Sequence, residues 1–342
     1  MILVCGPCSA ESFEQVYQTA QCIKDLGITY FRAGLWKPRT RPGGFEGVKE
    51  QGLTWLSRVK KDFNLKICTE IANPYMAEQC LENGFDAVWI GARTTQNPFL
   101  IEDIAQSLDK SNITVMVKNP LNPDIALWLG AIERFEKHGI KNIIAVHRGF
   151  SLSINKYRQT PLWRIPLELK RLRNDIPIIC DPSHISGKAN LVREIAFNAI
   201  STGFDGLMIE THINPSAALT DKDQQLNTNQ LKQLLQNLPI IDKNKNEDIE
   251  ELGLLRKQIN DIDNSIIEFL SERMAVSRKI AQVKKNKNLQ IFQSKRWQEV
   301  LESITENAKN NDLETSFVKE LYEIIHQESI QQQNIIINKS KD

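Results

Sequence analysis

The sequence predicts an α/β fold, a (β/α)8 TIM barrel over residues 1–240, followed by an all-α domain of three helices. Three observations predict it: eight short β-rich runs recur between residues 2 and 212, helix-length stretches separate them, and such runs disappear beyond Pro239. Several runs are apolar on both faces, as parallel strands covered by helices should be. At 342 residues the chain is also long enough for two domains.

The eight runs are, in order, ILVC, ITYFRA, LKICTEI, AVWIGA, ITVMVKN, NIIAVHRG, IPIICDPS and GLMIETH. An open, doubly wound sheet would also alternate strands with helices. Polar residues cluster where nearly every run ends, however, and a barrel builds its site from the loops at the carboxyl ends of all eight strands. We therefore expect a closed barrel.

The second domain follows a polar, charged stretch at 241–248, which we interpret as a linker. Apolar residues then keep a three-four spacing, which predicts one helix from about 249 to 287. Further helices are expected over 294–310 and 313–333, so that the domain spans 249–333 and a frayed tail follows at 334–342. The first helix would be roughly 58 Å long, which suits pairing with another chain and predicts a homodimer.

Composition and charge exclude several classes of function. Lys plus Arg number 43 against 42 Asp plus Glu, so no global field attracts nucleic acid or an acidic membrane. No apolar run approaches the roughly 20 residues of a membrane span, and the start lacks the pattern of a signal peptide. The six cysteines are scattered, which suits reduced thiols better than a disulfide framework. We expect a cytoplasmic protein.

The first run ends in Cys5-Gly6-Pro7-Cys8, a quartet that also occurs at the redox site of thioredoxin-like proteins. Those motifs normally have an aromatic residue before the first cysteine, whereas here Val4 precedes it. The redox interpretation is therefore kept only as a distant alternative.

A metal site explains more of the sequence. Cys8 is joined by His184 in DPSH, Glu210 in IETH and Asp221 in LTD, all after expected strand ends. A thiolate, an imidazole and two carboxylates suit a borderline divalent ion such as Mn, Fe, Co or Zn, whereas structural zinc would prefer more Cys and His. Each residue alone could be an ordinary loop residue or buried thiol, but four at one rim favour a metal site.

A set of cations follows the same strand ends. A solvated charged rim is the plain alternative for any one of them. Crowding them at one end of a barrel is costly unless a polyanion binds there, and Arg forks suit phosphate and carboxylate. The set comprises Arg32, Lys37, Arg39, Arg93, Lys118 and Arg148.

These stretches resemble 3-deoxy-D-arabino-heptulosonate 7-phosphate (DAHP) synthase, in the compact form shared with 3-deoxy-octulosonate 8-phosphate synthases. The octulosonate enzymes resemble Lys-Ala-Asn-Arg where this chain has KPRT, so the resemblance favours erythrose 4-phosphate over arabinose 5-phosphate. It covers residues 1–240 and rests on GPCS at 6–9, KPRT at 37–40, GAR at 91–93, HRG at 147–149, DPSH at 181–184 and the segment 210–221.

The resemblance implies roles for these residues. The metal would polarise the aldehyde oxygen while the enol carbon of phosphoenolpyruvate attacks the aldehyde carbon, and Lys118 would assist proton transfer. Arg39 and Thr40 would bind the phosphate of the aldehyde. The family's metal ligands fall on Cys8, His184, Glu210 and Asp221, and its phosphoenolpyruvate contacts on Arg32, Lys37, Arg93, Lys118 and Arg148.

The helical domain carries a second candidate site. Arg273 and Lys284 are eleven residues apart and share a helix face, while Arg256 points about 100° away. Ser329 and Gln333 are an i, i+4 pair on the last helix. A solvated helix face is the ordinary explanation for such charges.

Residues 249–333 nevertheless resemble the all-helical chorismate mutases, through LLRKQI at 254–259 and SERMA at 271–275. The resemblance implies that arginines bind the two carboxylates of chorismate, with Arg256 supplied by the partner chain, while Lys284 and Gln333 stabilise the breaking ether oxygen. The family's cations fall on Arg256, Arg273, Lys284 and Arg296, and its polar pair on Ser329 and Gln333.

The match has one departure. The family usually has an acidic residue after Arg296, where this chain has Trp297, and Gln293 stands where an Asp is common. The contact with the substrate hydroxyl is therefore open. The sequence predicts a bifunctional shikimate-pathway enzyme; the alternative is a synthase whose helical domain acts mainly as an allosteric sensor of chorismate or prephenate.

Overall fold

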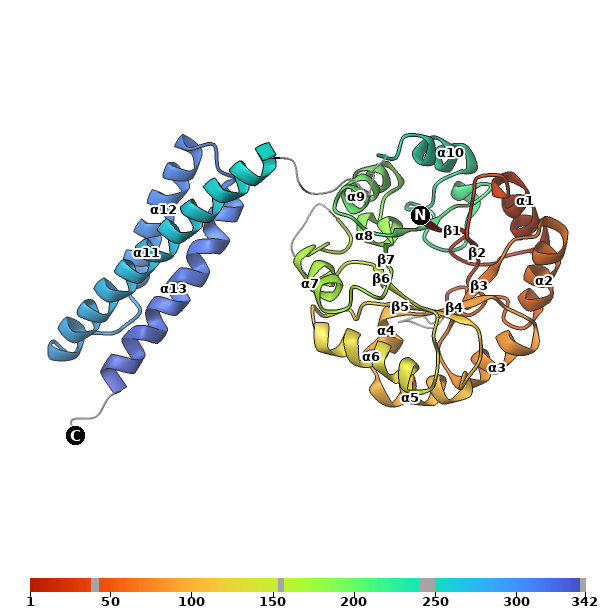
Figure 1. The fold of residues 1–342 in the computed structure, drawn as a ribbon, viewed down its shortest axis with the longest axis horizontal. Helices are drawn as coiled ribbons and strands as arrows, with labels where there is room; N and C mark the ends of the chain where they lie inside the picture. The colour runs from red at the N-terminus through yellow and green to blue at the C-terminus, as the bar shows by residue number, and fades with distance from the viewer. Residues whose placement is uncertain (38–42, 153–156, 240–249, 339–342) are drawn as a thin grey trace. The chain divides into compact units, whose positions relative to one another are not determined.

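The computed structural model describes residues 1–37, 43–152, 157–239 and 250–338. It divides into two compact units, Met1–Asp242 and Lys243–Asp342, which are described separately (Figure 1). The linker expected at 241–248 lies outside the described residues, as do Arg39 and Thr40. Among the described helices, none combines the length and apolar character needed to cross a membrane.

Eight parallel strands close into a barrel in the order β1 to β8, which confirms the predicted fold class. The barrel closes where β1 pairs with β8, Ile2 opposite Gly206 and Gly6 opposite Glu210. The strands are β1 (Ile2–Gly6), β2 (Tyr30–Arg32), β3 (Ile67–Ile71), β4 (Ala87–Ile90), β5 (Thr114–Lys118), β6 (Ile143–His147), β7 (Ile178–Cys180) and β8 (Gly206–Glu210).

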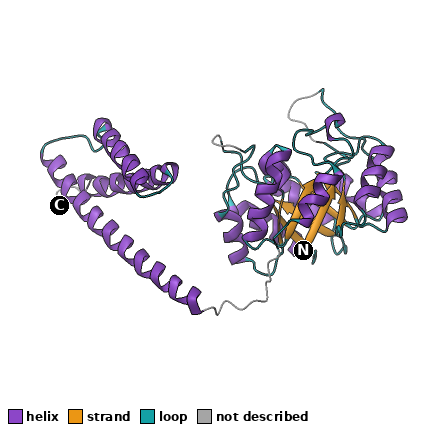
Figure 2. Cartoon of the chain, turned by 90° about the horizontal axis from the view of Figure 1, so that it is seen from above, coloured by secondary structure: helices purple, strands orange, loops and turns teal. Residues whose placement is uncertain are grey.

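Helices surround these strands (Figure 2). Several begin at a side chain that caps the first turn: Ser12 accepts from the backbone N–H of Gln15, and Asp124 from that of Leu127. The helices are α1 (Phe13–Ile23), α2 (Gln51–Phe63), α3 (Pro74–Glu82), α4 (Ala92–Thr95), α5 (Pro98–Ser107), α6 (Ile125–Lys137), α7 (Arg164–Leu172), α8 (Pro182–Ser186), α9 (Ala189–Ser201), the 3₁₀ turn η1 (Pro215–Ala217) and α10 (Thr228–Gln236).

Two apolar clusters build the core of the barrel unit. Side chains alternate along each strand, so Leu3 and Cys5 pack outward against the helices while Val4 points into the barrel. The interior cluster is a closed plug rather than a channel. It contains Val4, Tyr30, Cys68, Ala87, Trp89, Met116, Ile144, Val146, Ile179 and Met208.

The second unit consists of the three helices α11 (Glu250–Asn286), α12 (Ser294–Asn310) and α13 (Thr315–Asn338). We expected the last helix to end near Gln333 and the tail to be frayed, but α13 continues to Asn338. No Pro or Gly interrupts this stretch, and Lys285 donates from Nζ to the carbonyl of Ile336 at 3.2 Å, which satisfies an acceptor in the last turns.

The close approach at Gly206 generates a prediction. A Cβ at this position would lie 1.9 Å from the carbonyl oxygen of Ile2, inside the ladder that closes the barrel. Gly206→Ala should therefore lower the free energy of unfolding by about 1–3 kcal/mol or more, through forced backbone shifts. Urea unfolding followed by tryptophan fluorescence reports on the barrel, since five of the six tryptophans lie in residues 1–239.

Gly130→Ala is the matched control. It lies inside α6, where a Cβ meets only the flexible end of Arg134 at 3.2 Å, so this variant should be neutral or slightly stabilising. Equal stability of the two variants would contradict the importance of the Ile2–Gly206 contact.

Candidate functional sites

Strand alternation explains which side chains reach the carboxyl rim of the barrel. A residue two positions after an interior residue points the same way, one layer higher. Applied to the interior cluster, this rule places polar and charged groups in the layer directly above the apolar plug. These groups are Arg32, Glu70, Lys118, Arg148, Asp181 and Glu210.

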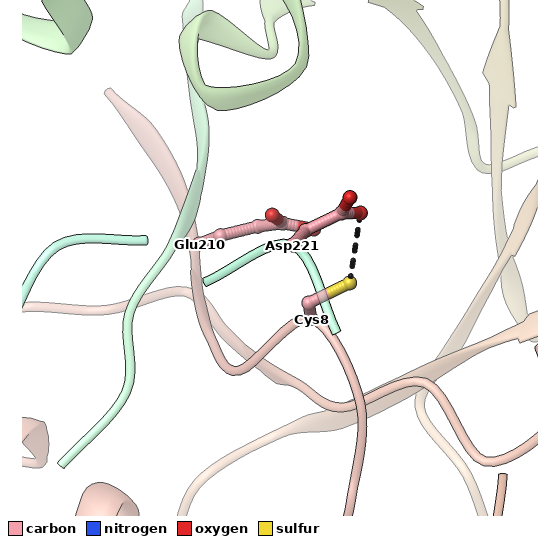
Figure 3. Close-up of side chains that lie close together, drawn as sticks. All are labelled: Cys8, Glu210 and Asp221. Carbon is pink, nitrogen blue, oxygen red and sulfur yellow. Dashed lines mark hydrogen bonds between the residues drawn. The ribbon is translucent and has the colours of Figure 1, made fainter. Parts of the chain in front are cut away.

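Three of the four predicted metal ligands meet at this rim. Potential ligand atoms of Cys8, Glu210 and Asp221 all lie within 4.8 Å of one another. Figure 3 shows the three side chains converging, with the Cys8 thiol 3.3 Å from Oδ2 of Asp221. The fourth, His184, lies beside them, with Nε2 3.8 Å from Oε1 of Glu210.

A buried carboxylate orients His184. Asp181 is fully buried, and its Oδ2 lies 2.8 Å from Nδ1 of His184 while its Oδ1 accepts from the backbone N–H of the same residue. The same carboxylate accepts a hydrogen bond from Nζ of Lys118 at 2.8 Å. Nδ1 thus faces the Asp181 carboxylate and Nε2 faces Glu210, the arrangement in which a carboxylate typically supports a metal-binding imidazole.

Burial and neighbouring charges shift the pKa values of Asp221 and Cys8 in opposite directions. Burial would raise the pKa of Asp221, but the neighbouring His184, Arg158 and Lys37 hold it well below its usual range. Burial raises the pKa of Cys8 to about 12, and the charge of Glu210 acts in the same direction. A thiol with so high a pKa loses its proton only when a strong cation binds to the sulfur. Together with the carboxylates around it, it fits a divalent metal ion.

Cations surround the cluster. Arg32 donates from Nη2 to Oε1 of Glu210 at 3.1 Å, with both side chains buried, and its guanidinium lies 4.7 Å from the ring centroid of Trp89. Lys37 donates from Nζ to both the carbonyl and the thiol of Cys8, each at 3.1 Å. These contacts hold positive charge directly against the candidate metal site.

A cavity of about 390 Å³ opens beside the cluster. Burial lowers the pKa of Arg148 to about 10, and its Nη1 is buried without a hydrogen-bond partner among the described residues. Buried cations that are not fully paired mark a place where a bound anion supplies the missing contacts. Charged residues that line the cavity are Lys37, Glu70, Arg93, Lys118, Arg148, Arg158, His184 and Asp221.

Sequence reasoning missed several of these residues. Arg158 donates from Nη1 to Asp221 at 3.0 Å and to Gln224 at 2.7 Å, but it lies in an irregular segment with no periodic signal. Asp181 stands within the DPSH motif and could have been identified there as the partner of His184. Gln224 donates in turn to Glu210 at 2.7 Å.

The helical unit brings together part of the second predicted set. Arg273 donates from Nη1 to Oγ of Ser329 at 2.5 Å, and Gln333 donates to Oγ of Ser277 at 3.2 Å. Lys284 donates to the carbonyl of Ile291 at 2.6 Å, and burial lowers its pKa. The contacts of Arg273 and Gln333 join α11 and α13, and that of Lys284 joins α11 to the segment before α12.

Two predicted residues stand apart from the group of polar side chains around Arg273. Arg296 is largely exposed and forms an ion pair with Glu299 on its own helix at 3.0 Å. Arg256 is exposed and precedes Arg273 by seventeen residues on α11, roughly 26 Å along the helix axis. Within one chain, Arg256 cannot therefore contribute to the group that contains Arg273.

Comparison with known proteins finds a family for each of the two units. Residues 1–246 match the DAHP synthetase I family, and residues 255–334 match chorismate mutase type II. A phospho-2-dehydro-3-deoxyheptonate aldolase of Thermotoga maritima is 32% identical over 240 residues, which cover 69% of this chain and 68% of that protein. A 2-dehydro-3-deoxyphosphooctonate aldolase of Helicobacter hepaticus is 27% identical, over 70% of this chain and 95% of that protein.

Solved structures give the same result. The crystal structure of the Thermotoga maritima DAHP synthase superposes with a TM-score of 0.63 at 30% identity, covering 69% of this chain and 67% of that one. A truncated form of the same enzyme gives a TM-score of 0.60 and is covered to 84%. The chain therefore belongs to the DAHP synthetase I family and carries a chorismate mutase type II domain C-terminal to its barrel in sequence, the architecture of a bifunctional shikimate-pathway enzyme.

Proposed function

We propose that the barrel condenses phosphoenolpyruvate with erythrose 4-phosphate at the cavity beside Cys8, Glu210 and Asp221. The observation that carries this proposal is the contact between an acidic, thiol-containing cluster and a cavity lined by cations. Both substrates are phosphorylated anions, and Arg forks and Lys ammonium groups both bind such groups. A catalyst of this reaction must hold two anions within bonding distance of each other, which like charges resist in water.

The residues of the chain have distinct roles in this proposal. Arg93 and Arg148 bind the phosphate and carboxylate of phosphoenolpyruvate, and Arg32 and Lys37 neutralise charge beside them. Lys118, whose Nζ donates to Asp181, would transfer the proton that moves when water adds at C2 of phosphoenolpyruvate, before phosphate leaves from that carbon. Cys8, His184, Glu210 and Asp221 would hold a divalent metal, Mn, Fe, Co or Zn, which supplies Lewis acidity toward the aldehyde oxygen.

The choice of aldehyde rests on the sequence. KPRT at 37–40 favours erythrose 4-phosphate, and Arg39 and Thr40 would bind its phosphate, although both lie outside the described residues. The heptonate aldolase from Thermotoga maritima supports this choice, whereas octonate aldolases are also among the similar proteins. All six cysteines are free, which fits a reducing compartment such as the cytoplasm.

For the helical unit we propose the rearrangement of chorismate to prephenate. Arg273 and Arg296 would bind the two carboxylates, Ser329 would position Arg273, and Lys284 and Gln333 would stabilise charge on the breaking ether oxygen. The rearrangement needs neither a nucleophile nor a metal. The burial of Ser329 and Gln333 beside Arg273 supports a preformed site.

We further propose that two chains pair through the helical unit. The first half of α11 exposes a long row of apolar residues that the described residues of its unit leave largely uncovered, including Leu255, Ile259, Ile262, Ile266 and Phe269. Monomers rarely expose apolar surface on this scale. A partner chain lying along α11 would cover it and would supply Arg256 to the site that contains Arg273.

The metal assignment predicts the behaviour of a cysteine variant. Cys8→Ala removes the one soft ligand, so Mn²⁺ or Zn²⁺ should bind on the order of 100-fold or more weakly in equilibrium dialysis. DAHP formation from erythrose 4-phosphate should fall in parallel, with unchanged far-ultraviolet circular dichroism. Cys5→Ala, the neighbouring thiol, is the control and should keep metal; full activity of the Cys8 variant would refute the ligand assignment.

The mutase assignment is tested by the absorbance loss of chorismate on purified full-length protein. Wild type should consume chorismate. Lys284→Ala should lower kcat/KM by about 10²–10³-fold, because it removes the hydrogen-bond donor that stabilises charge on the breaking ether oxygen. Lys279→Ala, exposed on the same helix, should leave the rate unchanged. A folded wild-type protein that consumes no chorismate would instead favour the sensor hypothesis.

A mixing experiment tests the shared site. Arg256→Ala and Arg273→Ala should each be inactive as mutases, but coexpression should restore activity. About half of the dimers would be mixed, and one of the two sites in each mixed dimer would contain both native arginines, so roughly a quarter of all sites should be active. Sedimentation should show a dimer for both variants. Absence of recovery in confirmed mixed dimers would mean that Arg256 does not act across the interface.

A further inference from the structure

The helical unit contains a histidine that none of these roles uses. His326 on α13 stacks on the indole of Trp297 on α12, with ring centroids 4.0 Å apart and ring planes inclined by 11°. Phe292, just before α12, packs against the same imidazole at a tilt of 60°, with a centroid distance of 6.0 Å. Two aromatic side chains thus fix the position of one imidazole.

The imidazole belongs to the same face as the proposed mutase residues. Ser329 and Gln333 follow His326 by three and seven residues, so the three side chains form one stripe along α13. Burial lowers the pKa of His326, and the positive charges of Arg273 and Lys284 lower it further. The ring therefore lies within electrostatic range of both cations and is neutral at neutral pH.

One ring nitrogen has no partner. Nε2 of His326 is shielded from solvent and forms no hydrogen bond with any described residue, and the same is true of Oε1 of Gln333. Buried polar atoms are almost always satisfied in proteins, so unsatisfied ones beside cations indicate where a ligand completes the hydrogen bonding.

We propose that His326 is a substrate-contacting residue, whose Nε2 forms a hydrogen bond with the ring hydroxyl of chorismate. This inference rests on the proposed mutase function. The two carboxylates of chorismate are matched by arginines and its ether oxygen by Lys284 and Gln333, which leaves the hydroxyl as the group that needs an uncharged polar partner.

The departure at Trp297 supports this assignment. The chorismate mutase resemblance leads us to expect an acidic residue there, and an indole cannot replace a carboxylate as an acceptor because its only polar group is a donor. Trp297 instead orients His326 by stacking. A neutral imidazole can either accept a hydrogen bond from a hydroxyl or donate one to it, so the contact is transferred from α12 to α13.

The test measures recognition of the hydroxyl directly. Calorimetry on full-length protein compares two bicyclic ether dicarboxylates shaped like the rearranging substrate, one with the ring hydroxyl and one without. Wild type should bind the hydroxylated compound about tenfold more tightly, the value of one net hydrogen bond. In His326→Ala this ratio should fall close to one, and in His326→Gln it should be partly restored.

Controls separate the hydrogen bond from packing. Gln327→Ala, exposed one residue further along α13, should keep the tenfold ratio. Trp297→Phe keeps a stacking ring and should also keep it, whereas Trp297→Ala should reduce it. An unchanged ratio in a folded His326→Ala protein would overturn this inference while leaving the mutase function intact; a wild-type protein that binds neither compound and consumes no chorismate would overturn both.

Discussion

Closure of the barrel between β1 and β8 is the constraint on which the synthase site depends. Gly6 pairs with Glu210, so the turn after β1 and the end of β8 meet although about 200 residues separate them. Cys8 lies in that turn, and the chain that leaves β8 brings Asp221 back over it. The candidate ligands therefore come together through strand register and not through local sequence.

The same rim must accommodate several buried charges, and they occur in compensating groups. Arg32 pairs with Glu210, while Asp181 contacts both Lys118 and His184. Removing one member of such a group leaves an uncompensated buried charge. The free-energy cost of that charge is larger than the stabilisation that the intact pair provides. The apolar plug lies directly below these groups. Within it, the buried Trp89 supports the Arg32 guanidinium with its ring face and excludes water from beneath the site.

How far the sequence could predict this arrangement follows from the kind of signal each residue leaves. The eight strands appear as short apolar runs and α11 as a long three-four spacing of apolar residues. Groups that end apolar runs, such as Lys118 and Glu210, are visible as breaks in them. Arg158 leaves no such signal, because it reaches Asp221 from an irregular segment whose path only the tertiary fold determines. The end of α13 was predicted too early because the tail IIINKSKD shows no periodic apolar pattern, whereas the contact between Lys285 and Ile336 lies in the last turns of the helix.

The two units solve the problem of binding anions in different ways. The barrel completes its cavity within one chain, since eight strands supply groups from all sides, and it can combine acids with cations there. Three helices have too little surface to enclose a substrate, and α11 both exposes its aliphatic residues and carries Arg256 far from Arg273. A second chain would both cover the exposed residues of α11 and bring its own Arg256 to the site that contains Arg273. Within such a pair, a neutral imidazole on α13 adds polarity without further positive charge beside Arg273 and Lys284, which an additional cation could not do.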